Sequence, residues 1–486
     1  MQNTSMNART KPIFVILLCG LYFSFPVFAE EQKPVEQAAV LEADSEQMEE
    51  GDTVRKQDEA AAEVPAEIPA GILPIPVYEG DFWKRGYLTG DWGGKRTEWA
   101  DHGVQFDLEW LQWDGSVVDG GLENKNRYGG TVTMNLVVDL MRAGIHPGSI
   151  LQIRTESRYC CSTLFDVGAQ AVPGNIAVLP PLNFSSLDGN EAIELVNLSY
   201  LHFLSAHVGV IIGKIDLFGD GDPNEFASGR GRTQFMNYNF NFAPQTLIVP
   251  ASTLGGGILY LPNQYWTISS MLFSGTDCTL GDCFKDLGDK GKISATSVTG
   301  QYSLGGKPGG VNAAYVYFFD KDFTNIDSIH VLPPPGGFES STKGHSWLAN
   351  ISFWQYLSVK EASEGPLDLH NRHADLQGWG LFGRFGFSDS ETNPWNTSVA
   401  IGIGGRGVIP SRPSDEFGIG YFYNKINLAR FLEVVGLNDS SAGVEAYYNL
   451  AITPAVGLTF DFQWLKSVFP HVEDATVLHA RLVMTF

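Results

Sequence analysis

Residues 456–486 decide the fold, and they read VGLTFDFQWLKSVFPHVEDATVLHARLVMTF. Within this stretch, apolar and polar residues alternate along 458–464 and again, with Val483 as an exception, along 478–486. The apolar face of the first segment holds Leu458, Phe460, Phe462 and Trp464. In the second segment the chain's last residue, Phe486, shares a face with Leu478, Ala480, Leu482 and Met484. A period of two is typical of a β-strand with one apolar face.

Similar alternating segments recur from Val104 to the end of the chain. Many span about 9–11 residues, which is the length that a tilted strand needs to cross a bilayer. A soluble β-sandwich, the competing interpretation, keeps its strands near five or six residues. Sixteen segments are expected: 104–113, 130–140, 149–159, 191–204, 207–216, 247–260, 265–274, 293–303, 310–319, 345–357, 376–387, 396–406, 416–426, 440–451, 456–465 and 475–486.

The connections between these segments alternate between short and long. Short ones cover 143–148, 205–206, 261–264, 305–309 and 453–456, and long ones cover 160–190, 218–247, 275–292 and 320–344. Short periplasmic turns and long outer loops are the pattern of an outer-membrane barrel, although 358–375 is a long exception. The sequence therefore predicts an all-β protein, a transmembrane antiparallel β-barrel of about 16 strands. An even number of strands places both ends in the periplasm.

The first 80 residues divide into two segments of different composition. Arg9 and Lys11 precede an apolar run at 12–28, and Val27 and Ala29 are small residues at the positions that a signal peptidase reads. We expect a signal peptide at 1–29, since the run is marginal for a membrane anchor. Residues 30–80 are acidic and rich in Pro, Ala and Glu, so we expect a disordered periplasmic segment. The barrel is expected at 81–486.

Charge and cysteine content exclude several classes of protein. The net charge is −23, so nucleic acid is a poor partner. No run beyond residue 28 approaches the ~18 apolar residues of a helical span. Four cysteines follow the signal, and Cys278 and Cys283 are close enough in an outer loop to form a disulfide in an oxidising compartment. Cys160 and Cys161 are adjacent, so a bond between them would be strained. No cofactor is expected.

Residues 86–104 read GYLTGDWGGKRTEWADHGV. This stretch resembles the opening of the carbohydrate-selective porin family known as OprB-like, through Leu88–Gly94, Arg96 and Gly103. A second resemblance lies in Gly213–Asp216, Asp222, Phe226 and Gln234–Asn237. The resemblance implies a bacterial outer-membrane channel through which small sugars diffuse. The residues themselves predict a short helix near 97–100, ended by Gly103, at the periplasmic mouth.

The alternation also indicates which charged residues face the lumen. The inward candidates are Asp107, Glu109, Arg154, Glu156, Arg158, Arg384, Glu445, Asp461 and Arg481. Arg donates several hydrogen bonds and carboxylates accept them, so mixed signs suit a neutral sugar, whereas a ring of one sign would favour ions. The alternative is that these charges solvate the wall or pair with one another. We expect Arg154, Glu156 and Arg158, which lie two residues apart, to form part of a constriction.

The long connection 218–247 is expected to fold inward and narrow the pore. It carries Asp220, Asp222, Glu225, Arg230 and Arg232. The run 220–225 faintly resembles a calcium loop but lacks the ligand spacing of an EF-hand, so a polar turn is the better interpretation. No metal site is expected elsewhere.

The leading functional hypothesis is passive sugar diffusion, and other classes remain open. A general or ion-preferring porin, an outer-membrane hydrolase and a soluble sugar-binding β protein are the alternatives. No nucleophile-elbow, zinc-protease or phosphate-loop motif supports an enzyme. Expected partners are small carbohydrates, outer-membrane lipid and the barrel assembly machinery, which would recognise the end at Phe486. Both a monomer and a homotrimer are compatible with the sequence.

Overall fold

The computed structural model describes residues 71–160, 163, 166–167, 193–217, 219, 222–228, 231–279, 282–285, 287–332, 338–360, 376–428 and 436–486. The expected signal peptide and residues 30–70 of the expected acidic segment lie outside the described residues. So do Asp220, Arg230 and Cys161.

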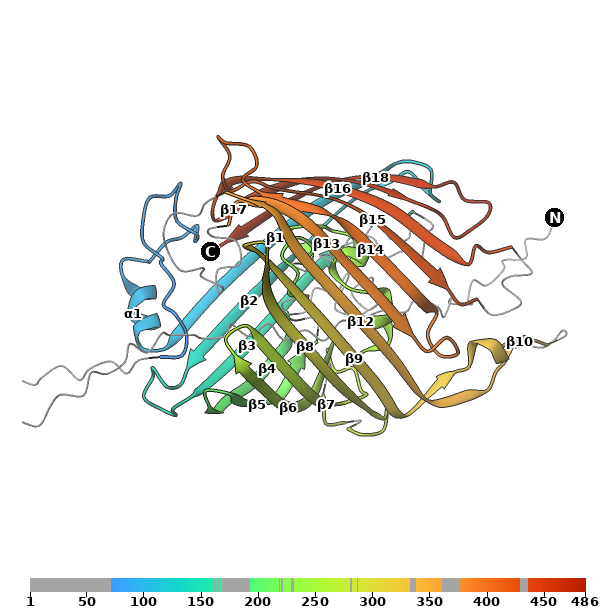
Figure 1. Ribbon diagram of the computed structural model, residues 1–486, viewed down its shortest axis with the longest axis horizontal. Coiled ribbons are helices and arrows are strands. Elements are labelled where there is room, and N and C mark those ends of the chain that lie inside the picture. The colour runs from blue at the N-terminus through green and yellow to red at the C-terminus, as the bar shows by residue number, and fades with distance from the viewer. Residues whose placement is uncertain are drawn as a thin grey trace, which may run out of the picture.

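Sixteen of the described strands close into one antiparallel barrel, as the alternation predicts (Figure 1). They are β1 (Val104–Asp119), β2 (Asn126–Asp139), β3 (Ser149–Cys160), β4 (Ile193–Ser205), β5 (Val208–Asp216), β6 (Ser252–Asn263), β7 (Trp266–Ser274), β8 (Lys292–Leu304), β9 (Lys307–Thr324), β12 (Thr342–Val359), β13 (Gly378–Ser388), β14 (Trp395–Arg406), β15 (Glu416–Ile426), β16 (Ser440–Thr453), β17 (Val456–Leu465) and β18 (Ala475–Thr485). Pairing of β1 with β18 closes the barrel, with Glu109 opposite Thr485 and Val117 opposite Val477.

Several strand boundaries differ from the sequence-based prediction: β1, expected to end at 113, ends at Asp119, and β9, expected to end at 319, ends at Thr324. The segment 247–260 was expected to be a strand, but Pro244–Ile248 is a 3-10 helix, η4, and β6 begins only at Ser252. Leu247 and Val249 are buried in the interior instead of continuing the strand. An apolar run of this length does not by itself distinguish a strand from another buried segment.

A short helix and the C-terminus lie at the same end of the barrel, and the small hairpin of β10 (His330–Val331) and β11 (Phe338–Glu339) lies at the opposite end (Figure 1). The helix, α1, spans Lys95–Asp101. Gly93 and Gly94 precede it with φ of 71° and 92°, a region that favours glycine. Short turns join most neighbouring strands at the end that carries α1, and the connection between β12 and β13 is the long exception.

Arg96 attaches α1 to the barrel. Its guanidinium donates to the backbone oxygen of Phe106 (2.6 Å) and to Oδ1 of Asp107 (3.0 Å). It also lies 4.1 Å from the ring centre of Tyr78, and burial raises the pKa of Tyr78 to about 12. Asp91 accepts hydrogen bonds from the backbone and hydroxyl of Thr97. Arg96, which belongs to the stretch 86–104, therefore holds the N-terminal segment around Tyr78 against the start of β1.

The outward faces of the strands are mostly apolar, and many polar and charged side chains point inward. On β17, Phe460 and Phe462 are exposed on the outside, whereas Asp461 and Gln463 are buried within. In the described part of the chain, no helix has the length and hydropathy that a membrane span requires.

Candidate functional site: a loop inside the barrel

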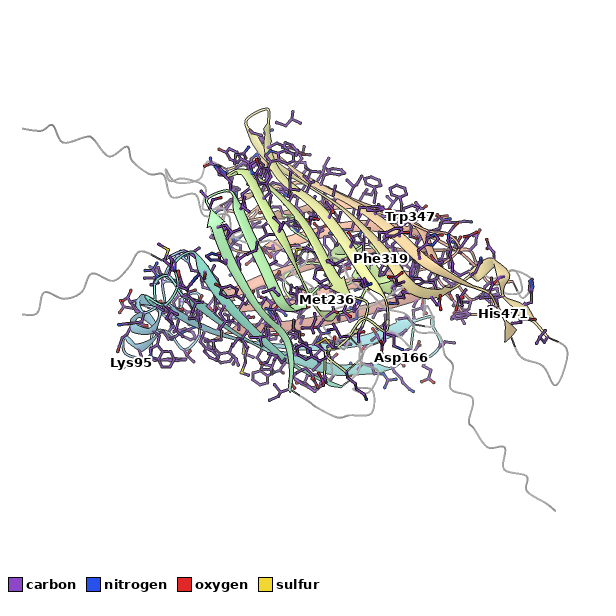
Figure 2. All side chains as sticks on the ribbon, turned by 90° about the horizontal axis from the view of Figure 1, so that it is seen from below. Lys95, Asp166, Met236, Phe319, Trp347 and His471 are labelled. Carbon is purple, nitrogen blue, oxygen red and sulfur yellow. A yellow bond between two sulfur atoms is a disulfide. The ribbon has the colours of Figure 1, made fainter. Side chains whose placement is uncertain are left out.

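The described residues of the segment between β5 and β6 (217, 219, 222–228 and 231–251) fold into the barrel, and we call them the inner loop. It contains the one-turn helix α2 (Tyr238–Asn241) and η4. Met236, near its middle, is fully buried and lies within the ring of strands (Figure 2). Most of its described residues have little or no exposure, which is unusual for a surface loop.

Asp222 fastens the first part of the inner loop to the wall. Its carboxylate is fully buried and accepts hydrogen bonds from Arg384 on β13 (Nε, 3.0 Å) and from Ser352 on β12 (2.9 Å). Asn312 on β9 contributes a longer contact of 3.3 Å. Nη2 of Arg384 donates to the same carboxylate and to the backbone oxygen of Ala227. A buried charge requires this kind of pairing.

Glu445 and Arg481, farther along the same side of the barrel, hold the middle of the inner loop. Glu445 on β16 accepts hydrogen bonds from the backbone N–H groups of Met236 (2.5 Å) and Asn237 (2.9 Å). Arg481 on β18 donates to the backbone oxygens of Gly231 and Gln234. Backbone groups that would otherwise be buried without partners are thus satisfied by charged side chains of the wall.

Aromatic packing complements these polar anchors. The ring of Phe235 in the inner loop lies 4.5 Å from that of Phe240, 5.3 Å from that of Phe382 on β13 and 4.8 Å from that of Tyr447 on β16. Phe226 similarly contacts Tyr356 on β12 at 4.8 Å. Buried aromatic pairs of this geometry each contribute roughly 0.5–1.5 kcal/mol beyond area burial. The inner loop is therefore bound to the side of the barrel formed by β12–β18.

On the other side, Arg232 of the inner loop extends to β1 and β3. Its guanidinium lies 3.3 Å from the carboxylate of Glu109 and donates to Glu156 at 2.9 Å. Glu156 also accepts from Arg158 at 2.8 Å. The side chains of Glu109, Arg232 and Arg158 keep 22%, 17% and 11% of their exposure, whereas Glu156 is fully buried. We call these four residues the crossing cluster.

The remaining residues singled out in the sequence have other partners. Asp107 pairs with Arg96 of α1. Arg154 donates to Asn135 at 2.7 Å and lies 3.4 Å from Asp216. Asp461 pairs with His479 at 2.8 Å.

Several residues that position the inner loop do not stand out in the sequence. The hydroxyl of Tyr356 on β12 donates to Glu225 (2.9 Å), and Gln463 on β17 accepts from the side chain of Asn237. Ser352 and Asn312 contact Asp222 in the same way. The alternation along each strand could have placed these neutral side chains on the inward face. Nothing in the sequence indicated that they contact the inner loop.

A disulfide joins Cys278 and Cys283 in the connection between β7 and β8, with an S–S distance of 2.01 Å. Lys214 on β5, just before the inner loop, donates to the backbone oxygen of Cys278 at 2.7 Å. The disulfide ring thus lies against the strand that leads into the inner loop.

Among the described residues, no three His, Cys, Asp or Glu side chains are grouped as a metal site would require.

Comparison with known proteins identifies relatives of this architecture. Porin B of Pseudomonas aeruginosa is 21% identical over 440 residues, which cover 82% of this chain and 91% of Porin B. The high-pH structure of Pseudomonas putida OprB superposes with a TM-score of 0.67 at 19% identity, covering 84% of this chain and 100% of that one. Its low-pH structure gives a TM-score of 0.50 at 15% identity, covering 83% and 99%. The family model described as carbohydrate-selective porin, OprB family, matches residues 123–486. Because that match extends over most of the chain, the chain belongs to the OprB family of carbohydrate-selective porins.

Proposed function

We propose that this protein is a sugar-selective diffusion channel of the bacterial outer membrane whose selectivity is set at the crossing cluster. The observation that carries this proposal is the path of the inner loop. Where Arg232 meets β1 and β3, it leaves partly exposed donors and acceptors of both signs. A sugar presents hydroxyl groups that both donate and accept, so alternating guanidinium and carboxylate groups can exchange hydrogen bonds with it as it passes.

Weak binding is essential to this role. A solute must bind well enough to enter and loosely enough to leave. The charges of the crossing cluster already pair with one another, so a sugar replaces existing contacts rather than satisfying empty ones. A hydrogen bond to a charged group contributes about 1.5–3 kcal/mol, and an exchange in which one such bond replaces another leaves only a small net gain, which suits rapid passage.

The test is electrical recording from the purified channel in planar bilayers with sugar added. Replacing Arg158 and Arg232 together with Gln removes two positive charges, so we expect a shift toward cations and a sugar block weakened roughly 2- to 10-fold. Arg412→Gln, in the exposed turn between β14 and β15, is the matched control and should leave both properties unchanged. A wild-type channel without sugar block would favour the alternative, a general or ion-preferring porin.

The family and fold are those of a channel, and we propose that the chain performs no chemical turnover. Release of product from glycan or lipid substrates by the purified barrel would contradict this.

We further propose that outer-membrane lipid surrounds the barrel and that the assembly machinery recognises the last strand. The terminal residue supports the second point, because the backbone N–H of Phe486 donates to Leu108 at 2.8 Å and so ends the seam between β18 and β1.

A further inference from the structure

A cavity lies between the inner loop and the barrel wall, and none of its lining residues belongs to the crossing cluster. It measures about 240 Å³ up to its open mouth. The inner loop contributes Glu225 and Phe226 to its lining, and the wall contributes Tyr356 on β12, Arg406 on β14, Glu416 on β15 and Tyr447 on β16. We call this space the side cavity.

The side cavity lies toward the end of the barrel that carries α1. β14 ends at Arg406 and β15 begins at Glu416, whereas the inner loop joins β5 and β6 at the opposite end. Arg406 and Glu416 are directly opposite each other on neighbouring strands. Residues in such positions have Cβ atoms about 4.5–5.5 Å apart. A solute that has passed the inner loop from the opposite mouth therefore meets this pair before it leaves the barrel.

Arg406 supplies a hydrogen-bond donor that the protein does not use. Its Nη1 is buried and has no hydrogen-bond partner within the described part of the chain. A buried donor without a partner is costly, so this nitrogen requires an acceptor from a ligand or from water. The carboxylates of Glu225 and Glu416 line the same space, so the side cavity presents donors and acceptors together.

Aromatic rings form much of the remaining lining. The rings of Phe226 and Tyr356 lie 4.8 Å apart, and the hydroxyl of Tyr356 donates to Glu225 at 2.9 Å. A pyranose has C–H groups on its ring faces and hydroxyls at its edge, so it can contact aromatic rings and charged groups at the same time. Pockets for drug-sized ligands combine these two kinds of surface in about 300–1,000 Å³. The smaller side cavity fits a single monosaccharide.

We propose that the side cavity is a second solute subsite, where a neutral monosaccharide is held briefly on the α1 side of the crossing cluster. This inference rests on the proposed function as a sugar channel. The described lining carries two carboxylates and one guanidinium, so it disfavours acidic sugars. Two weak subsites in series let a solute advance, because neither holds it tightly enough to block the channel.

Sugar block measured from each side of a planar bilayer tests the subsite. Glucose is added to one chamber at a time, and current noise gives its entry rate into the full mature channel. Arg406→Gln should lower entry from the α1 end roughly 3- to 10-fold and leave entry from the other end as in wild type. Arg412→Gln, in the exposed turn that follows β14, is the matched control and should change neither rate. An unchanged entry rate from the α1 end, or an equal loss from both ends, would overturn the proposal.

A second variant tests the charge of the subsite. From the α1 end, the wild-type channel should admit glucose in preference to gluconate, which carries a carboxylate on a similar carbon chain. Glu416→Gln should reduce this preference roughly 2- to 5-fold, because it removes one of the repelling charges. Asp320→Asn, at an exposed ion pair, should keep the wild-type preference. Heat-induced mobility shift in gels verifies that each variant is folded. A Glu416→Gln channel with the preference of wild type would refute the subsite.

Failure of the subsite differs from failure of the proposed function. A wild-type channel that glucose blocks from neither end would contradict both. If replacing Arg158 and Arg232 weakens the block while Arg406→Gln leaves it intact from both ends, the sugar channel stands and the side cavity holds only water.

Discussion

Replacing Asp222 with Ala tests whether the inner loop is held by its buried ion pair. The change removes the acceptor of Arg384, Ser352 and Asn312 and leaves the guanidinium of Arg384 buried at 2% exposure. Removing one partner of a buried pair costs roughly 3–5 kcal/mol. At about 1.4 kcal/mol per factor of ten, the ratio of detached to docked loop should rise by roughly two to three and a half powers of ten. The strand pairing of the barrel does not depend on this contact.

The expected phenotype of Asp222→Ala is a channel of larger, noisier conductance whose current sugars block less. Single-channel recording measures all three, and heat-induced mobility shift in gels verifies that the barrel is folded. Asp320→Ala is the control, because Asp320 makes an exposed ion pair with Lys292 in which the two side chains keep 68% and 50% of their exposure. Asp222→Ala with the conductance, noise and sugar block of wild type would refute the argument that this pair docks the loop.

Three further outcomes follow from the structure. Arg96→Gln removes the contacts to Asp107 and three aromatic rings, so proteolysis should release the segment before β1 more rapidly while the barrel stays resistant. Mass spectrometry of the mature protein should find Cys278 and Cys283 joined, and their replacement by Ser should weaken local stability by roughly 2 kcal/mol, since the closed ring is small. Burial raises the pKa of Asp415, but hydrogen bonds from Arg412, Tyr448 and a backbone N–H outweigh burial and hold it below its ordinary value. The stability that Asp415 contributes is therefore complete above a pH of about 4 and is lost as the pH falls through the lower pKa of the folded state, an effect that Asp415→Asn should remove from thermal melts.

The alternation of residues was sufficient to predict the barrel. A strand of period two has only two faces, so Asp461 and Gln463 had to point away from Phe460 and Phe462. The number of strands, the class of fold and the inward side of Arg384, Glu445 and Arg481 follow from this local rule. The start of β6 did not, because the apolar residues at 247–249 are satisfied by packing inside the barrel.

The partners of the charges were decided by the tertiary structure alone. The alternation predicts that Glu156 and Arg384 face inward, but it carries no information on the path of a loop that joins two other strands, β5 and β6. Asp222 meets Arg384 across 162 positions of sequence, and Arg232 meets Glu156 across 76. Such pairs form only when the closed wall and the inner loop are assembled together, because each long-range contact depends on the register of every strand between them. The amino-acid sequence thus determined the wall and the side on which each charge lies, and the tertiary structure determined which charges meet across the lumen.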